Sequence, residues 1–356
     1  MAKEQAAAIP GQTESIPAWR TRLAGSFTLL ILIVIMAIFT IWEGTKFFNL
    51  VNFNTIAIDS SQLMLLAVGS TFVIITAGID LSVSSTLVLS AVIAAQLMVK
   101  LSGTTEQVTA YEFPNQHVAI PIGLAAGVVT GLICGIINGL LVTRLKMPPF
   151  IVTLGTLGVF LGVAQLLTGG TTVPYVPPAV QTDIGLRTVI GFTIAGQQIQ
   201  LTPPLLIALA IAFVCAISLN RTRFGRYTYA IGSNVAAARR VGIDVEWHLV
   251  KVYALCGLLA GVAGAFDLLR FGTASVGSHT DDNLAAISAA VIGGTSLFGG
   301  IGTIGGTVVG ALIPAVLRNG LVIGRVQSFW QNIAIGMVLI LAVYLDQRRR
   351  AAEERM

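Results

Sequence analysis

The stretch that decides the fold is NRTRFGRYTYAIGSNVAAARRVGIDVEWHLVK, from Asn220 to Lys251. It is the longest polar interval between two strongly apolar runs, residues 204–219 and 250–269. Runs of this length are long enough to cross a lipid bilayer, so the interval predicts a loop between two membrane spans. Six of the chain's 21 Lys and Arg residues lie in it, and basic loops favour the cytoplasmic side of a membrane.

The middle of this loop predicts a short surface helix. Residues 235–240 are helix formers, and Ser233 or Asn234 precedes them where a polar side chain caps the first turn. Gly242 follows where a left-handed residue ends many helices. We therefore expect a small capped helix at the inner face of the membrane.

The composition is that of a protein with several membrane spans. Hydrophobic residues make up 55% of the chain and charged residues 10%, whereas soluble domains carry about 25% charged residues. The net charge of +5 comes from basic residues scattered over short loops, without the stripe or patch that binds nucleic acid. The sequence therefore indicates an integral protein of the lipid bilayer and no nucleic-acid partner.

The apolar runs predict an all-α fold with about ten transmembrane helices, two of them short. The expected spans are residues 23–42, 61–79, 83–100, 118–141, 150–168, 203–219, 250–270, 284–298, 305–319 and 330–345. They form a single membrane domain, residues 23–346, between an N-terminal tail, residues 1–22, and a C-terminal tail, residues 347–356. Within that domain, residues 220–249 form the cytoplasmic loop.

The positions of the basic residues predict the orientation of the chain. With the N-terminus inside, 15 of the 21 Lys and Arg residues fall in inner segments, so both termini are expected in the cytoplasm. Two outer loops, residues 101–117 and 169–202, are long and show little apolar periodicity. They are either docking surfaces for an external partner or solvated connections.

Glycines recur at four-residue spacing in the fourth expected span, at Gly123, Gly127, Gly131, Gly135 and Gly139. In lipid, small residues at this spacing let a neighbouring helix approach closely. The same theme continues at Gly155, Gly158, Gly162, Gly257, Gly261 and Gly264. Together these glycines predict a dense helix bundle.

The sequence contains no recognisable nucleotide-hydrolysis motif and no catalytic constellation. A phosphate-binding G-x-x-x-x-G-K-[ST] segment is absent, so ATP and Mg would belong to a separate ATPase subunit. The three histidines, His117, His248 and His279, lie far apart without ligand spacing. We therefore assign no catalytic residue, metal ligand or cofactor to this chain.

The run from Gly293 to Gly306 predicts a tight reversal between two short helices, because glycine permits positive φ angles and close backbone contact. Gly293, Gly294, Gly299 and Gly300 are candidate hinge or gate residues. A formal G-x-G-x-x-G lies within the run, but no strand precedes it and no suitably placed acidic residue follows it. A dinucleotide site is therefore disfavoured.

Few ionisable groups lie within the expected spans, which disfavours proton-coupled transport. Asp80 or Ser82 either caps the next helix or makes a gate contact, and Asp267 lies three residues before Arg270, close enough to pair locally. Uncharged polar side chains either line a path for a neutral, hydroxyl-rich solute or join neighbouring helices by hydrogen bonds. These are Gln62, Thr71, Asn138, Gln165, Asn283 and Asn332.

Five motifs, in this order, are similar to those of the permease subunits of bacterial ABC importers for simple sugars such as ribose, xylose and galactose. They are TFVIITAGIDLSV (Thr71 to Val83), NGLLVTRLKMPPFIVTLGTLG (Asn138 to Gly158), TRFGRYTYAIGSN (Thr222 to Asn234), AISAAVIGGTSLFGGIGTIGGTVVGA (Ala286 to Ala311) and the closing Leu345-Asp346. The resemblance covers residues 50–346. It implies the type II fold of vitamin B12-type importers, in a bacterial inner membrane.

The same resemblance implies partners and a site. It implies a second permease copy, two cytoplasmic ABC ATPase subunits and an extracytoplasmic sugar-binding protein, with import by alternating access. It also implies that the cytoplasmic loop is the coupling segment that seats in the ATPase. The matching residues are Asn234, Ala237, Ala238, Arg239, Gly242 and Ile243.

Two other functions remain open from the residues. Permeases for branched-chain amino acids or autoinducers share the late glycine-rich motif, and no pore residue separates their cargo from a sugar. A self-contained secondary transporter would work without an ATPase and bind its coupling ions near the midplane of the membrane.

Overall fold

The computed structural model describes residues 18–194 and 196–327, together with residues 329–331, 333–334, 336–337, 340 and 344. Much of the expected span 330–345, the C-terminal tail and all but the last five residues of the N-terminal tail lie outside the described residues. The elements of the first half are α1 (Ala18–Glu43), η1 (Gly44–Lys46), α2 (Leu50–Ile75), α3 (Val83–Ser102), α4 (Thr105–Thr109), α5 (Gln116–Arg144) and α6 (Pro149–Thr168). Those of the second half are η2 (Val180–Gly185), β1 (Ile190–Ile194), β2 (Gln197–Leu201), α7 (Pro203–Arg221), α8 (Arg223–Ser233), α9 (Val235–Arg240), α10 (Val245–Phe271), α11 (Asp282–Ile292) and α12 (Ile304–Ile323).

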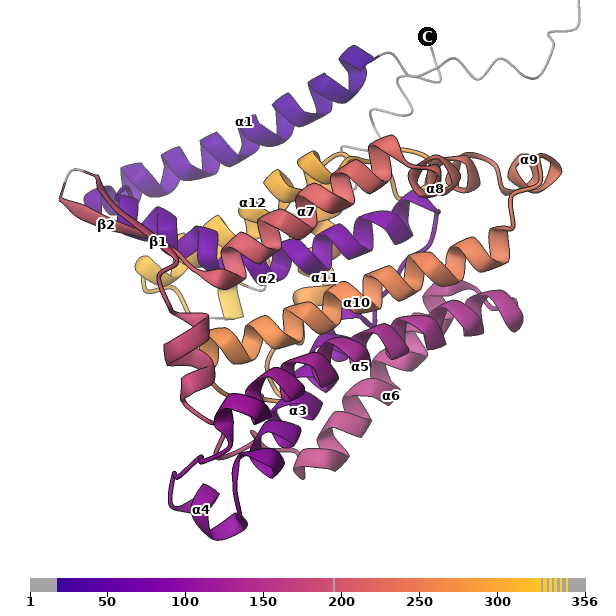
Figure 1. The fold of residues 1–356 in the computed structure, drawn as a ribbon. Helices are drawn as coiled ribbons and strands as arrows, with labels where there is room; N and C mark the ends of the chain where they lie inside the picture. Colours follow the sequence, from indigo (N-terminus) through magenta and orange to yellow (C-terminus); the bar gives the residue numbers. More distant parts are fainter. Residues whose placement is uncertain are drawn as a thin grey trace, which may run out of the picture.

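The long helices lie side by side as one bundle (Figure 1). Within the described residues, eight helices are long and apolar enough to cross a membrane, and α11 is a shorter apolar helix. Helices α8 and α9 lie at one end of the bundle, which we call the α9 end. The strands and α4 lie at the opposite end, which we call the hairpin end.

The expectation of a purely α-helical chain is wrong in one respect. Strands β1 and β2 pair as an antiparallel hairpin, with Ile190 opposite Leu201 and Ile194 opposite Gln197. Apolar residues alternate with polar ones or glycine along each strand, which is a strand signal, but both strands are only five residues long. The segment of residues 169–202, which we expect to be an outer loop, is thus partly ordered by local pairing.

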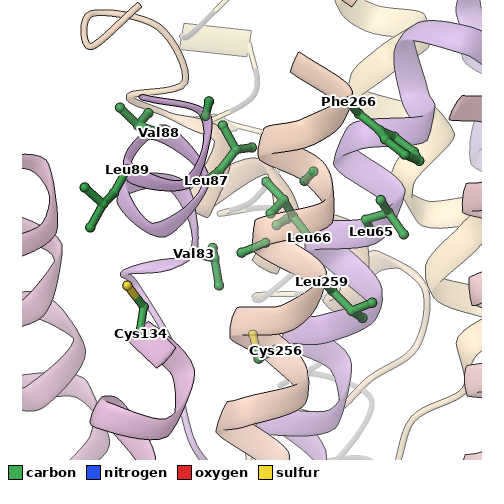
Figure 2. Close-up of a cluster of buried hydrophobic side chains, with 14 of the residues drawn as sticks. Leu65, Leu66, Val83, Leu87, Val88, Leu89, Cys134, Cys256, Leu259 and Phe266 are labelled. Atoms are coloured by element: carbon green, nitrogen blue, oxygen red, sulfur yellow. The ribbon is translucent and has the colours of Figure 1, made fainter. Parts of the chain in front are cut away.

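The core lies where α2, α3, α5 and α10 meet. Figure 2 shows Leu66, Leu87 and Leu259 pointing into the space between these helices; all three are buried. The three cysteines are buried and free, as expected for small packing residues.

Close helix contact at the α5 glycines is confirmed. A Cβ atom built on Gly131 would lie 2.4 Å from the carbonyl oxygen of Gly257, and one on Gly257 would lie 2.3 Å from that of Gly131. A real Cβ atom does not approach a carbonyl oxygen so closely, so only glycine permits this separation of α5 and α10.

The corresponding expectation for α6 is wrong within the described chain. A Cβ atom at Gly155, Gly158 or Gly162 would meet no described atom within 4 Å. The spacing of these glycines aligns them on one face of the helix, but the other helices of the chain pack elsewhere. The spacing of the α6 glycines thus predicted a helix face without side chains, but it did not predict what packs against that face.

Candidate functional site

Helix α9 is the short capped helix that the sequence predicts. The Asn234 side-chain oxygen accepts a hydrogen bond from the backbone N–H of Ala237 at 2.9 Å. At the other end Gly242 has φ +84°, and the N–H of Ile243 donates to the carbonyl of Ala238 at 3.1 Å. Both ends of α9 are therefore fixed by local hydrogen bonds.

Helix α8, which precedes α9, was not predicted from the sequence. The Thr222 side chain caps it by accepting from the N–H of Gly225. Its residues are strongly amphipathic rather than apolar, a pattern typical of a helix that lies on a surface. The long polar loop is thus mostly two helices.

The six predicted coupling residues divide into two groups. Asn234, Ala237, Arg239 and Gly242 are exposed at the α9 end. Ala238 is only 3% exposed and packs with Ile231 and Val245, and Ile243 lies partly buried against them.

Two of the predicted coupling residues also make contacts within the chain itself. Ala238 packs α9 against Ile231 and Val245. Arg239, which is exposed, forms an ion pair with Glu246. The exposed apolar side chains Val235 and Val241, which the sequence reading did not single out, extend the surface that α9 presents.

The structure brings the coupling segment against the predicted hinge loop, residues 293–303. A Cβ atom on Gly232 in α8 would lie 1.7 Å from the carbonyl oxygen of Ile75 at the end of α2. That same carbonyl accepts a hydrogen bond from the N–H of Gly300 at 2.8 Å. Three segments far apart in the sequence therefore meet backbone to backbone.

Tyr229 strengthens this junction from α8. Its hydroxyl donates to the carbonyl of Gly302 at 2.6 Å. Burial raises the pKa of Tyr229 to about 12, so the hydroxyl keeps its proton at neutral pH. This hydrogen bond is a second contact between α8 and the loop that joins α11 and α12.

The predicted tight reversal of residues 293–306 is confirmed over residues 293–303, since α12 begins at Ile304. Gly294, Gly299 and Gly300 have φ angles of +93°, +85° and +76°, in the region that favours glycine. Gly293 has an ordinary negative φ, but a Cβ atom there would lie 2.5 Å from the backbone of Gly306. The four candidate hinge glycines thus serve two purposes: three supply backbone conformation and Gly293 supplies close approach.

Asp80 and Ser82 form a buried contact instead of capping α3 by a side chain. One oxygen of Asp80 accepts from both the N–H and the hydroxyl of Ser82, at 2.8 and 2.7 Å. The amide of Asn138 in α5 donates to the Ser82 hydroxyl oxygen at 2.7 Å. This network ties the connection between α2 and α3 to α5.

The candidate path residues that the structure describes lie in different surroundings. Thr71 bonds Thr307 inside the bundle at 2.7 Å, and the Asn283 amide donates to the carbonyl of Leu81. Gln165 is exposed on α6, and Asn332 lies outside the described residues. For Thr71, Asn138 and Asn283, hydrogen bonding between segments describes the observed contacts, and Gln62 lines a cavity.

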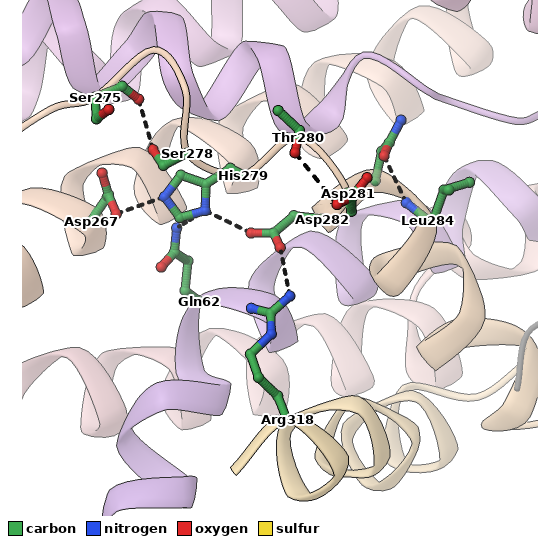
Figure 3. Close-up of polar contacts among 11 residues, drawn as sticks. Gln62, Asp267, Ser275, Ser278, His279, Thr280, Asp281, Asp282, Leu284 and Arg318 are labelled. Atoms are coloured by element: carbon green, nitrogen blue, oxygen red, sulfur yellow. Dashed lines mark hydrogen bonds and ion pairs between the residues drawn. The ribbon is translucent and has the colours of Figure 1, made fainter. Parts of the chain in front are cut away.

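A charged network at the hairpin end was not predicted. Figure 3 shows the His279 ring between two carboxylates, with Gln62 beside it. Its Nε2 lies 2.8 Å from Asp267 and its Nδ1 lies 2.7 Å from Asp282, and Arg318 reaches Asp282 at 3.7 Å. The imidazole therefore joins α10 to α11, and Asp282 in turn joins α11 to α12.

The predicted local pair of Asp267 with Arg270 is wrong. Asp267 bonds His279, while Arg270 forms an ion pair with Asp59 of α2 at 2.6 Å. Three-residue spacing permits an ion pair on one helix, but Asp267 and Arg270 each pair with a side chain from another segment. That choice depends on packing and is not encoded in the spacing.

The two carboxylates keep His279 charged at neutral pH. Burial by itself would lower the pKa of His279, but the hydrogen bonds and charges of Asp267 and Asp282 outweigh it and raise the pKa to about 10. Since the pKa is raised above its ordinary value of 6.5, the resulting stabilisation is complete below that value. It is lost as the pH rises through about 10.

We expect replacement of His279 by glutamine to lower the apparent Tm of the detergent-solubilised protein by several degrees at about pH 6. The deficit relative to the wild type should shrink toward zero by about pH 11, where the imidazole no longer carries a charge. Thermal unfolding of both proteins across this pH range measures the difference. His117→Gln, at an exposed position, is the control, and a deficit independent of pH would contradict a role for the imidazolium charge.

Two adjoining hollows, of about 430 and 390 Å³, surround this network. Both are lined by Phe271, His279, Asp282 and Arg318. Volumes of this size are typical of small-molecule sites. Among the residues that the structure describes, no group of three or more His, Cys, Asp or Glu side chains could hold a metal ion.

Comparisons with known proteins give a consistent result. Residues 52–343 match the family model described as branched-chain amino acid transport system / permease component. The chain is 40% identical to the ribose import permease protein of Bacillus subtilis (strain 168), over 91% of this chain and 92% of that protein. No solved structure matches the chain significantly.

Further relatives carry similar names. The chain is 34% identical to the ribose import permease protein of Escherichia coli (strain K12), over 96% of this chain and 98% of the relative. It is also 34% identical to the galactose/methyl galactoside import permease protein of the same strain, over 91% of this chain and 94% of the relative.

Proposed function

This chain belongs to the family of branched-chain amino acid transport system permease components, and we propose that it is the membrane-spanning subunit of an ABC importer for a monosaccharide or related polyol. The observation that carries the proposal is similarity along nearly the whole length of relatives named as import permeases for ribose and galactose. Those relatives are named for different sugars, so the class of cargo is proposed and the individual sugar is not.

In this proposal the chain supplies the path for the sugar and the mechanical link to the ATPase, and it does not itself hydrolyse ATP. In this proposal a separate cytoplasmic ABC ATPase binds ATP and Mg, and α9 seats against it. The exposed Asn234 and Ala237 and the capped ends of α9 support this docking. A short helix with fixed ends is suited to transmit a push as a rigid body.

The proposed orientation places the α9 end and both termini in the cytoplasm, with ten spans in a type II fold. The hairpin and α4 then face outward, where an extracytoplasmic sugar-binding protein would dock. A second copy of the chain would complete the permease in the inner membrane. Arginines at the α9 end, such as Arg221, Arg223 and Arg226, support this orientation through the positive-inside rule.

Alternating access follows from differential binding to two conformations. Docking of the loaded binding protein outside and closure of the ATPase inside would each favour one conformation of the bundle. The backbone junction of Gly232, Ile75 and Gly300 provides the mechanical connection. Motion of α9 and α8 would shift α2 and the hinge loop, and through that loop α11 and α12.

Affinity purification of the tagged full-length chain in mild detergent from its native membrane tests this proposal. We expect a nucleotide-hydrolysing subunit to copurify. After reconstitution in liposomes with the binding protein, the complex should take up a radiolabelled sugar only when ATP is supplied. ATP-driven uptake of L-leucine instead would support the amino-acid permease, and uptake by the isolated chain without ATP would support a secondary transporter.

A further inference from the structure

The two adjoining hollows at the hairpin end form one cavity, which has the size and the lining of a site for a small polar molecule. The hollows lie between α2, α10, α11 and α12 and share the wall formed by His279, Asp282 and Arg318. Gln62 lines the second hollow with its amide nitrogen 3.5 Å from His279. Phe271 contributes an aromatic ring to both.

Most charges around the cavity are paired with one another. Asp267 and Asp282 flank His279, Arg318 approaches Asp282, and Asp59 pairs with Arg270. These three carboxylates face two guanidinium groups and one imidazolium, and Asp281 adds a fourth carboxylate to the lining of the first hollow. A charged ligand would have to displace one of these partners, and a buried charge without its partner is costly. A neutral ligand leaves all of the pairs intact.

One polar atom in the lining lacks a partner. The side-chain oxygen of Asn319 in α12 is buried and has no hydrogen-bond partner among the residues that the structure describes. Asn319 lines the same hollow as Gln62. A buried acceptor of this kind is normally satisfied by a protein group, by water or by a ligand. Because the oxygen is shut off from solvent, the Asn319 side chain has to turn toward the hollow before a ligand hydroxyl can donate to it.

We propose that this cavity binds the neutral monosaccharide or polyol in transit, with Gln62 and a reoriented Asn319 side chain bonding its hydroxyl groups and Phe271 covering its less polar face. This inference rests on the proposed function and deepens it by naming a cargo site within the permease. Hydroxyl groups both donate and accept hydrogen bonds, so they suit a lining that mixes amides and paired ions.

Protection of an introduced cysteine tests the site directly. Thr55 lines the cavity from α2, and Thr55→Cys places a small thiol there with little change in size. The three native cysteines are buried, so a membrane-impermeant maleimide should react with the new thiol. Thr171→Cys, exposed at the same end but outside the cavity, is the matched control.

The labelling is measured on the full-length chain in lipid nanodiscs, with D-ribose, D-galactose or D-fructose added separately. We expect at least one of these sugars to slow labelling of Thr55→Cys. At about ten times its dissociation constant, a ligand that blocks the thiol should slow the reaction about tenfold, because only empty sites react. Labelling of Thr171→Cys should not change. Adding Asn319→Leu to the Thr55→Cys chain should abolish the protection at that concentration while the chain still elutes as a single species.

Two results would overturn the site. One is equal labelling of Thr55→Cys with and without every sugar, and the other is protection by L-leucine but by no sugar. Sugar uptake by the unmodified importer distinguishes a failure of the proposed cavity from a failure of the proposed function. ATP-driven sugar uptake without protection would refute the cavity and leave the proposed function standing, whereas the absence of both would refute the proposed function as well.

Discussion

Replacing Gly257 by valine is expected to unfold the bundle or to lower its stability severely. The new side chain would start 2.3 Å from the carbonyl oxygen of Gly131 and 2.6 Å from the backbone of Gly135, so α5 and α10 would have to separate. Overpacking against backbone cannot be relieved by a change of rotamer, and we expect a cost of about 3 kcal/mol or more. Thermal unfolding and monodispersity in detergent would measure it.

Gly158→Val is the matched control, since it adds the same atoms to a helix glycine. No described atom lies within 4 Å of a Cβ at Gly158, and valine is a better helix former than glycine. The Tm of this variant should equal or exceed that of the wild type. Equal loss in both variants would show that backbone propensity, and not the contact between α5 and α10, sets the cost.

The second large effect is expected at α9. Ala237→Trp should leave the fold intact, because Ala237 is exposed, but it should prevent α9 from seating in the ATPase. Loss of a central docking contact costs about 2 kcal/mol or more, which is at least about 30-fold in affinity. ATP-dependent sugar uptake and copurification of the ATPase should therefore fall together, by at least that factor.

Ala125→Trp, on an exposed part of α5, controls for the added bulk and should support uptake at the level of the wild type. Ala238→Trp gives a sharper contrast, because Ala238 is buried against Ile231 and Val245. That variant should also lower stability, whereas Ala237→Trp should not. Normal uptake by a well-inserted Ala237→Trp protein would rule out the docking role of α9.

The structure changes the interpretation of the hinge glycines. The sequence marked residues 293–306 as a reversal between two helices, and marked the coupling segment separately. The junction of Gly232, Ile75 and Gly300 brings these two parts of the chain into contact. Backbone contact between α8 and the loop that joins α11 and α12 is thus a property of the fold.

The sequence by itself determined the features that depend on neighbours along the chain and on the lipid. Long apolar runs specify membrane spans because uncompensated polar groups are excluded from hydrocarbon. Asn234 and Gly242 specify α9 because caps act within one turn of a helix. The five ordered motifs pointed to sugar-import permeases, and the relatives are named accordingly.

Only the tertiary structure decided which side chains and helix faces meet. Asp267 bonds His279 and not Arg270. The α5 glycines pack against α10, whereas a Cβ atom at the α6 glycines would contact no described atom within 4 Å. The physical reason is that the spacing of residues fixes the face of a helix on which a side chain lies, while the partner of that face is set by the packing of the whole bundle. The charged cavity around His279 is assembled from α2, α10, α11 and α12, so no single stretch of sequence could have revealed it.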